Sequence, residues 1–415
     1  MATTSLDTRT YDGGLTRRDV VRWRNALFVV FALSGLAIAT WLGRVPTVRD
    51  ILHASTLEMG FLAGGISVGS IVGVTLSSHV IAAVGAKRAV LGTLLLVAAG
   101  MTAAGVCAAT GGGFWAILVC MAFFGYGQGT MDVSMNVSAA ACERVLGRTV
   151  MPLFHASFSL GTMFGAILGA GAEAISMPIW LHMLILAIVL AVAAIIFVPR
   201  LQSEDLGHAA RDESAPAAVG GWRGRLAVWA TPGTIFIGLI VLGMATAEGS
   251  ANDWLALAMV DGHGVDNAAG TSIFFVFVTA MTIARVAGTP LIDRFGRVLM
   301  LRLSAVSAIL GLLLVILAPT VPLAIVGVVF WGFGAALGFP VGLSAAADDS
   351  RNAAARVSAV ATIGYVAFLA VPPLIGFLGQ HFGLLHALFM VLVLIVIAGF
   401  ASGAAREPGR RVPTE

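Results

Sequence analysis

Twelve long apolar runs constrain this chain more than any other feature of its sequence. Each run is about 20 residues long, the length that an α-helix needs to cross the hydrocarbon core of a bilayer. Only 11% of the 415 residues are charged, against about 25% in soluble domains. The runs are too long and too uniformly apolar for the strands of a membrane barrel. The sequence therefore predicts an all-α membrane protein with 12 transmembrane helices.

The runs fall into two groups of six, separated by the longest polar stretch. We expect spans at about 25–43, 57–84, 89–109, 114–141, 150–174 and 179–198, and then at about 233–256, 271–291, 299–318, 322–343, 357–377 and 384–403. The predicted organisation is an N-terminal tail, a six-helix bundle, a flexible linker, a second six-helix bundle and a C-terminal tail. These parts occupy residues 1–21, 22–198, 199–231, 232–403 and 404–415.

The distribution of positive charge predicts the orientation. If both termini lie inside, the cytoplasmic tails, linker and loops contain all but three of the 24 Lys and Arg residues. The three exceptions are Arg44, Arg49 and Arg285. Arg44 and Arg49 then lie outside, and Arg285 lies within a span. Because Lys and Arg concentrate in cytoplasmic loops, both termini and the linker are expected to be cytoplasmic.

The two halves also repeat in sequence. The motif Phe124-Gly-Tyr-Gly, followed by Ser138-Ala-Ala-Ala, recurs as Trp331-Gly-Phe-Gly, followed by Ser344-Ala-Ala-Ala. Spans that run in the same direction in both copies form a parallel repeat. Such a repeat implies two bundles related by an axis along the membrane normal.

The first copy of the motif carries a polar face that the second copy lacks. Gln128, Asp132 and Asn136 are spaced by four residues and so lie on one helix face. A carboxylate inside a bilayer is costly and usually faces a water-filled pathway. Phe339 stands where Asp132 does in the first copy. Either Asp132 serves transport or a neighbouring helix satisfies it.

A second polar patch runs from Glu248 to Trp254 in an otherwise apolar span. Its Gly and Ser residues suit a discontinuous helix that opens its backbone to a ligand. Amides and carboxylates bind hydroxyl groups and an indole packs on a sugar face. Glu248 and Asn252 therefore resemble part of a polyol site, together with Gln128, Asn136 and Trp254. Two alternatives stay open: a hydrogen-bonded helix contact for Glu248, and an interfacial aromatic belt for Trp41 and Trp254.

Three further features have two interpretations each. His155 is either a hydrogen-bonded packing residue or a contact for substrate or proton. The stripe Gly161, Gly165 and Gly169 allows close helix approach, either for static packing or for sliding. Arg285 either snorkels to the interface or pairs with an acid.

The sequence lacks the patterns of several other classes of protein. It has no phosphate-cradling loop, metal-ligand cluster or plausible Ser/His/Asp arrangement. We therefore expect no enzyme activity, no cofactor and no metal. Its basic residues are spread among short loops, which does not suggest nucleic-acid binding.

The loop Asp293-Arg294-Phe295-Gly296-Arg297 resembles the loop signature of the major facilitator superfamily. In the first half Gly85, Lys87 and Arg88 remain, with Ala82 at the acidic position. Within the superfamily, Asp132-x-x-x-Asn136 is similar to an element in the fourth helix of fucose-permease-like proton symporters. Their first-helix acid has no counterpart in span 25–43. The stretches 247–254 and 259–263 look closer to a subgroup of bacterial inner-membrane sugar-type permeases.

The resemblance implies a central cavity lined by the first, fourth, seventh and tenth spans, and it places Asp132 and Glu248 there. Desolvation favours the proton-bound form of a carboxyl group, so Asp132 is expected to be the main proton carrier and Glu248 the second. The expected substrate-binding residues are Gln128, Asn136, Asn252, Asp253, Trp254, Trp41, Tyr126, His155 and Tyr365. The expected gating residues, which form a salt-bridge latch between loops, are Asp293, Arg294, Arg297, Lys87, Arg88, Arg144 and Arg148.

Three functional classes follow from these features. The first is a monomeric, proton-coupled importer of a small polar solute, such as a sugar derivative, in the lipid bilayer of a bacterial inner membrane. Na⁺ is the alternative coupling ion. The second is a proton-driven exporter of amphipathic compounds, whose Gly-Pro signature is missing because Ala166 follows Gly165. The third is a membrane sensor that transports nothing.

Overall fold

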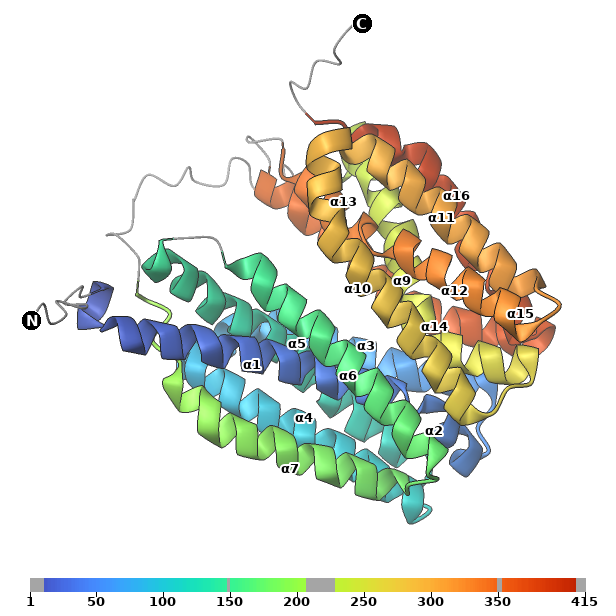
Figure 1. Ribbon diagram of the computed structural model, residues 1–415, viewed down its shortest axis with the longest axis horizontal. Coiled ribbons are helices and arrows are strands. Elements are labelled where there is room, and N and C mark those ends of the chain that lie inside the picture. Colours follow the sequence, from blue (N-terminus) through green and yellow to red (C-terminus); the bar gives the residue numbers. More distant parts are fainter. Residues whose placement is uncertain (1–10, 148–149, 207–227, 349–352, 408–415) are drawn as a thin grey trace, which may run out of the picture. The chain divides into compact units, whose positions relative to one another are not determined.

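The computed structural model describes residues 11–147, 150–206, 228–348 and 353–407, and all regular secondary structure within these ranges is helical (Figure 1). Twelve helical segments in this part of the chain are long and apolar enough to cross a membrane. The prediction of an all-α protein with 12 transmembrane helices is confirmed.

Before the polar segment, the α-helices of the described residues are α1 (Arg17–Leu42), α2 (Val45–Leu52), α3 (Thr56–Val84), α4 (Ala86–Ala109), α5 (Gly113–Leu146), α6 (Met151–Ala174) and α7 (Ile179–Phe197). After it, the described ranges contain α9 (Pro232–His263), α10 (Asn267–Phe295), α11 (Arg297–Leu317), α12 (Val321–Ala335), α13 (Gly338–Ala346), α14 (Ala353–Phe382), α15 (Leu384–Ala387) and α16 (Phe389–Ala401). Most predicted span ends lie within a few residues of these bounds. The short helix α2 was not predicted.

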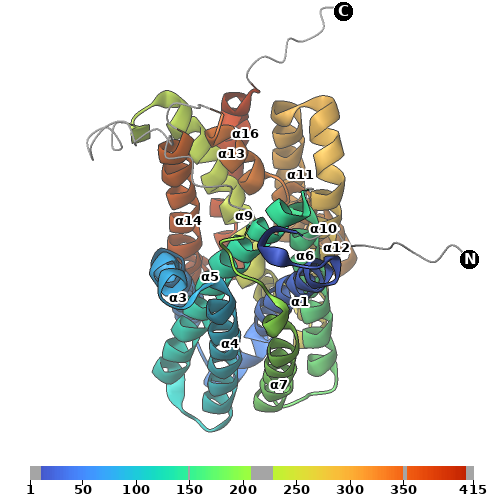
Figure 2. The ribbon, with the colours of Figure 1, turned by 90° about the vertical axis from the view of Figure 1, so that its left-hand side faces the viewer.

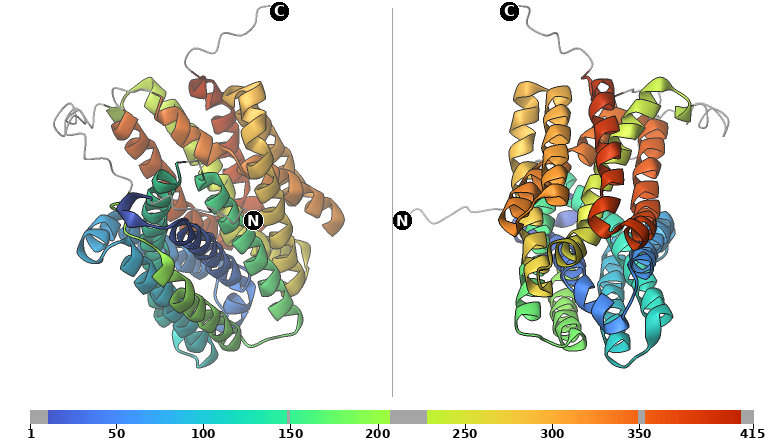
Figure 3. Two further views of the ribbon diagram at one scale, coloured as in Figure 1. Left: turned by 60° about the vertical axis from the view of Figure 1, so that its left-hand side comes forward. Right: turned by 90° about the vertical axis from the view of Figure 1, so that its right-hand side faces the viewer.

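The contacts between helices divide the chain into two compact units. The first comprises Met1–Leu52 and Gly65–Ala215, and the second comprises His53–Gly64 and Pro216–Glu415. In the first unit α4 packs against both α5 and α7, and α1 packs against α6 (Figure 2). In the second unit α9 packs against α14 and α16, and α11 packs against α12 (Figure 3). Residues 207–227 of the predicted linker lie outside the described ranges.

Glycines let α1 and α6 approach closely in the first unit. A Cβ atom on Gly161 would collide with the backbone of Ala32, and one on Gly165 would collide with the backbone of Leu36. Gly35 on α1 meets the α6 backbone in the same way at Phe158. Small residues at four-residue spacing therefore bring these two helices into backbone contact, as such residues do in membrane proteins.

The repeated Gly-x-Gly motif has the same packing role in both units. In the first unit Gly125 packs on α3 and Gly127 packs on α4. In the second unit Gly332 packs on α10 and Gly334 packs on α11. Each pair thus fixes the fourth span of its half between the second and third spans of that half, so the sequence repeat is also a repeat in packing.

The tenth span is interrupted, whereas the seventh is not. Helix α12 ends at Ala335 and α13 begins at Gly338. Pro340 has no N–H to donate to the carbonyl four residues earlier, which belongs to Ala336. Helix α9 runs without a break from Pro232 to His263. The predicted discontinuity at the patch 248–254 is therefore wrong, and the proline in the tenth span explains why the break lies there.

Candidate functional site

The polar face of α5 lies in the first unit. The Asn136 amide donates hydrogen bonds to the backbone carbonyl of Asp132 at 2.8 Å and to its carboxylate at 3.3 Å. The side chain of Asp132 is exposed. Gln128 donates to the carbonyl of Ser34 on α1 at 3.2 Å. The structure thus brings Asp132 and Asn136 together and leaves the carboxylate accessible, while Gln128 ties α5 to α1.

Two more observations characterise the contact between α5 and α1. The indole N–H of Trp23 donates to the hydroxyl of Ser138 at 3.1 Å inside the unit. The side-chain oxygen of Gln128 is buried and has no hydrogen-bond partner among the described residues. Because buried acceptors are usually satisfied, this oxygen is available to a hydroxyl group of a bound solute or to water.

The other predicted binding residues of the first unit lie in different environments. Trp41 is buried, and so it does not lie at the surface, where a residue of an interfacial belt would lie. Tyr126 is half-buried on α5. His155 is exposed on α6, with its ring edge-on to Phe31 at a centroid distance of 5.4 Å.

A cation, a carboxylate and a backbone carbonyl meet in the second unit. The guanidinium Nη2 of Arg285 on α10 lies 2.6 Å from Oε1 of Glu248 on α9. Its Nε donates to the carbonyl of Ala336 at 3.2 Å, the group that Pro340 cannot satisfy. The two charged side chains are 29% and 16% exposed, respectively. Of the two interpretations of Arg285, the structure shows the pair with an acid.

The patch on α9 divides between two faces of the helix. Gly243 packs directly on α16 at Leu394. Helical periodicity places Ser250 and Trp254 on the same side, and both are buried. Glu248 and Asn252, which is half-buried, lie on the opposite side. The structure therefore does not bring the Trp254 indole onto the face that carries Glu248.

Asp253 is half-buried, and the described residues offer its carboxylate no hydrogen bond or ion pair. The buried indole nitrogen of Trp254 and the hydroxyl of Ser250 likewise have no partner in this part of the chain. The second unit thus contains several polar groups that its own described side chains leave unsatisfied.

An aromatic wall formed by Phe368 and Phe339 packs on α9 at Gly249. The ring of Phe368 on α14 lies against Gly249, the residue that follows Glu248. Phe339 on α13 is edge-on to Phe368, with 6.2 Å between the ring centroids, and its ring also contacts Gly364. The adjacent Tyr365 is partly exposed. The residue that replaces Asp132 in the second copy of the repeat is therefore part of this wall.

A buried ionic cluster in the first unit was missed by the sequence analysis. Arg44 Nε lies 3.3 Å from the Glu173 carboxylate, and the two side chains are only 2% and 8% exposed. Arg44 also donates to the carbonyl of Met177 at 2.7 Å, and the Thr47 hydroxyl donates to Glu173. His182 is buried near the start of α7. The cluster fastens the turn between α1 and α2 to the turn between α6 and α7.

Two of the basic residues predicted for gating have local partners in the first unit. Lys87 donates to the carbonyl of Pro199 at 2.6 Å, and Arg144 donates to the carbonyl of Glu204 at 3.2 Å. Arg88 is exposed, and Arg148 lies outside the described residues. Lys87 and Arg144 thus hold the segment that follows α7.

The predicted gating residues of the second unit lie around the start of α11. Arg297 donates to Asp348 at 2.6 Å and to the Ser344 hydroxyl at 3.0 Å. The guanidinium of Arg294 lies over the ring of Phe295, 5.2 Å from its centroid. Asp293 is exposed at the end of α10. The latch between loops stays a prediction.

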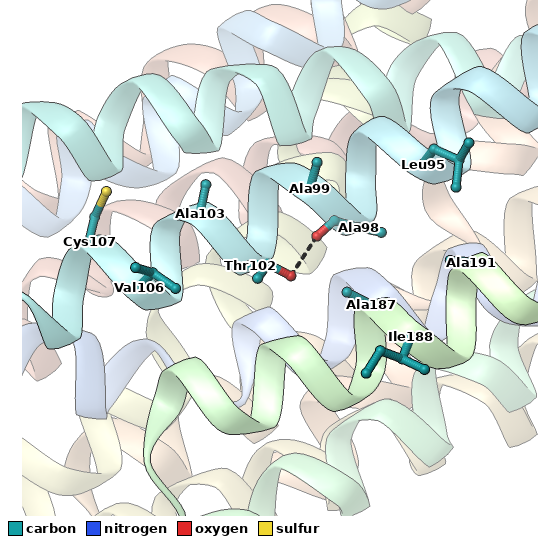
Figure 4. A pocket seen from close by; sticks show the side chains of 10 residues that line it. All are labelled: Leu95, Ala98, Ala99, Thr102, Ala103, Val106, Cys107, Ala187, Ile188 and Ala191. Atoms are coloured by element: carbon teal, nitrogen blue, oxygen red, sulfur yellow. Dashed lines mark hydrogen bonds between the residues drawn. The ribbon is translucent and has the colours of Figure 1, made fainter.

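A groove of about 600 Å³ between α4 and α7 has a different character (Figure 4). Its lining is almost entirely apolar, and includes Leu95, Val106 and Ile188. The hydroxyl of Thr102 donates to the carbonyl of Ala98 in its own helix at 2.8 Å. The groove therefore offers no directed polar group to a solute, unlike the clusters around Asp132 and Arg285.

Comparisons with known proteins agree with this architecture. The model of the Major Facilitator Superfamily matches residues 27–367 and also 254–414. The uncharacterized transporter y4wD of Sinorhizobium fredii is 29% identical over 93% of this chain and 97% of its own length. An uncharacterized MFS-type transporter of Yersinia pestis is 28% identical over 91% of this chain and 94% of its own length.

Solved structures share the fold at low sequence identity. The nucleoside transporter NupG superposes with a TM-score of 0.72 at 14% identity, covering 92% of this chain and 99% of its own. The fucose:proton symporter FucP of E. coli superposes with a TM-score of 0.61 at 14% identity, covering 94% of this chain and 100% of its own. The relatives are named as transporters rather than enzymes. Together with the twelve apolar helices, the family match shows that this chain is a multi-pass inner-membrane transporter of the Major Facilitator Superfamily.

Proposed function

We propose that this chain is a proton-coupled symporter that imports a small polar solute, a sugar or sugar derivative, by alternating access. The observation that carries the proposal is the accessible carboxylate of Asp132, which lies in the middle of the long apolar helix α5 next to Asn136. An ionisable group at such a place in a membrane protein usually marks the path of a solute or a proton.

The geometry suits a proton carrier. Asn136 donates to the Asp132 carboxylate and thereby holds its orientation without supplying a positive charge. A carboxyl group in a medium of low polarity favours its neutral form, and a change in its hydration therefore moves its proton. Asp132 can take up a proton when its surroundings open to one side and release it when they open to the other.

Hydroxyl groups of the solute have several partners in this scheme. In the first unit the buried oxygen of Gln128 is an unused acceptor, and the amide of Asn136 lies two helical turns further along α5. The named functions of two proteins with the same fold, a nucleoside transporter and a fucose:proton symporter, support a polar, hydroxylated solute. The same proposal includes cytoplasmic termini, a monomeric state and a latch formed by Asp293.

The test combines binding and transport. The purified protein is screened for ligands that raise its melting temperature, since a ligand that binds only the folded state stabilises it by mass action. A hit is then offered to proteoliposomes with an imposed pH gradient. We expect Asp132→Asn to abolish gradient-driven uptake while it keeps the ligand-induced shift. Asp205→Asn, an exposed carboxylate after α7, is the matched control. Full pH-driven uptake by Asp132→Asn contradicts the proposal.

A further inference from the structure

We propose that the solute is a sugar acid whose carboxylate binds Arg285 by displacing Glu248, so that the freed Glu248 takes up a proton. This inference rests on the proposed function and deepens it, because it names the chemical class of the solute. It is carried by the contacts of Arg285 with α9 and with the break between α12 and α13.

The guanidinium of Arg285 is anchored but not saturated. Its Nε is held by the carbonyl of Ala336, and one N–H of Nη2 is used by Glu248. An arginine has five N–H donors in a rigid plane, so three donors remain without a partner in the described part of the chain. The side chain is 29% exposed. An incoming anion therefore meets a pre-oriented set of donors.

The charge balance of the cluster selects a singly charged ligand. Arg285 and Glu248 carry one positive and one negative charge, and their paired atoms are 2.6 Å apart. A ligand carboxylate can take the place of Glu248 because it has the same charge and the same planar pair of oxygens, which matches a guanidinium. A doubly charged phosphate ester would leave an excess negative charge in a poorly hydrated site, which is costly.

The surroundings of the pair suit a carbohydrate ring. Phe368 lies beside Gly249, and Phe339 is edge-on to Phe368. Asn252 lies one helical turn from Glu248, on the same face of α9. A few directed polar groups beside an aromatic wall are typical of a site that binds a small solute. The combination of a guanidinium, an amide and aromatic rings fits a sugar acid.

Displacement of Glu248 couples the solute to a proton. Before binding, Arg285 and Glu248 balance each other. After binding, the ligand carboxylate balances Arg285, and Glu248 has lost its counter-ion. In a poorly hydrated site, a carboxylate that has lost its counter-ion favours the protonated form and takes up a proton from the solution. The group of Arg285, Glu248 and the ligand carboxylate then remains neutral. One proton is therefore bound for each anion, with no covalent step.

The test uses the full-length purified protein and matched pairs of sugars that differ in one carboxylate: glucose with glucuronate, galactose with galacturonate, and glucitol with gluconate. We expect at least one acid to raise the melting temperature more than its neutral partner. Glucose 6-phosphate should be no better than glucose. In Arg285→Gln, affinity for the acid should fall by about ten- to a hundredfold, because a charge-assisted hydrogen bond is lost.

A second measurement follows the proton. Binding of the acid in a weakly buffered solution with a pH indicator should take up one proton per anion in the unaltered protein and none in Glu248→Gln. Glu248→Gln should also bind the acid more tightly, since no carboxylate has to be displaced. Arg285→Lys and the double variant Arg285→Gln/Glu248→Gln are the folding controls. Their melting temperatures without ligand distinguish a loss of binding from a loss of folding.

The outcomes separate this inference from the proposed function. Stabilisation by neutral sugars but not by acids overturns the inference and leaves the importer of polar solutes standing. An acid that binds Arg285→Gln as well as it binds the unaltered protein, or a panel in which no acid raises the melting temperature, also overturns it. Full gradient-driven uptake by Asp132→Asn contradicts the proposed function instead.

Discussion

The guanidinium of Arg285 lies 2.6 Å from the carboxylate of Glu248, although the two residues are 37 positions apart in the chain. The contact joins α9 to α10, and a second hydrogen bond from the same guanidinium reaches Ala336 at the break in the tenth span. One side chain therefore links three segments of the second unit, and the pair has consequences for stability as well as for binding.

Removing one partner of this pair should destabilise the protein more than removing both. Arg285→Gln or Glu248→Gln leaves a poorly hydrated charge without its counter-ion, which we expect to cost about 1–3 kcal/mol because both groups are partly exposed. The double variant removes both charges and should recover part of this loss. Melting temperatures of the two single variants and the double variant measure the coupling. Additive effects would contradict a coupled pair.

Restoring an N–H at position 340 should repair the interrupted helix. In Pro340→Ala the new backbone donor can bind the Ala336 carbonyl, which now accepts from Arg285. We expect transport to fall sharply while the melting temperature is unchanged or higher, because alanine is the best helix former and its N–H lets α12 continue into α13. Pro322→Ala is the control: this proline stands in the first turn of α12, where a missing N–H has no consequence. Equal transport by both variants would show that the break is not needed.

Much of this fold can be predicted from the local sequence. The parts that cannot be predicted in this way are determined by contacts between residues that lie far apart in the chain. Span lengths and their number follow from hydropathy, because a bilayer fixes the length of an apolar helix. Pro340 is a sequence signal for the break in the tenth span. The discontinuous helix was nevertheless predicted at 248–254, because the polar and small residues there also suit a break. Arg44 and Glu173 lie on different helical segments, so no local pattern joins them.

The candidate site shows the same division. The spacing of Asp132 and Asn136 predicts their contact, because helical periodicity alone brings them together. The sequence leaves two interpretations of Arg285, since a long side chain can reach either an interface or a neighbouring helix. The position of Phe368 beside Gly249 follows from the packing of α14 on α9, which no sequence pattern fixes.

The ionic cluster at Arg44 should be important for stability. Arg44→Ala leaves Glu173, whose side chain is only 8% exposed, without its counter-ion. Removing one partner of a buried pair typically costs about 3–5 kcal/mol, and a large fall in melting temperature is expected. Arg49→Ala is the matched control, because the pair of Arg49 with Asp50 includes a carboxylate that is 49% exposed, and such pairs contribute about 0–1 kcal/mol. Similar melting temperatures for the two variants would contradict the structural role of the cluster.

Backbone contact between α1 and α6 can be tested by two alanines in one helix. In Gly161→Ala the new Cβ would collide with the carbonyl of Ala32, and since both atoms belong to packed helices, the helices must move apart. We expect a lower melting temperature and reduced transport. Gly171→Ala places its Cβ in open space, with no atom within 4 Å, and should stabilise α6 by up to about 1 kcal/mol. The two variants add the same methyl group to the same helix, so opposite shifts in melting temperature isolate the close contact from helix propensity. Equal shifts would mean that α1 yields to the added methyl group without loss of packing.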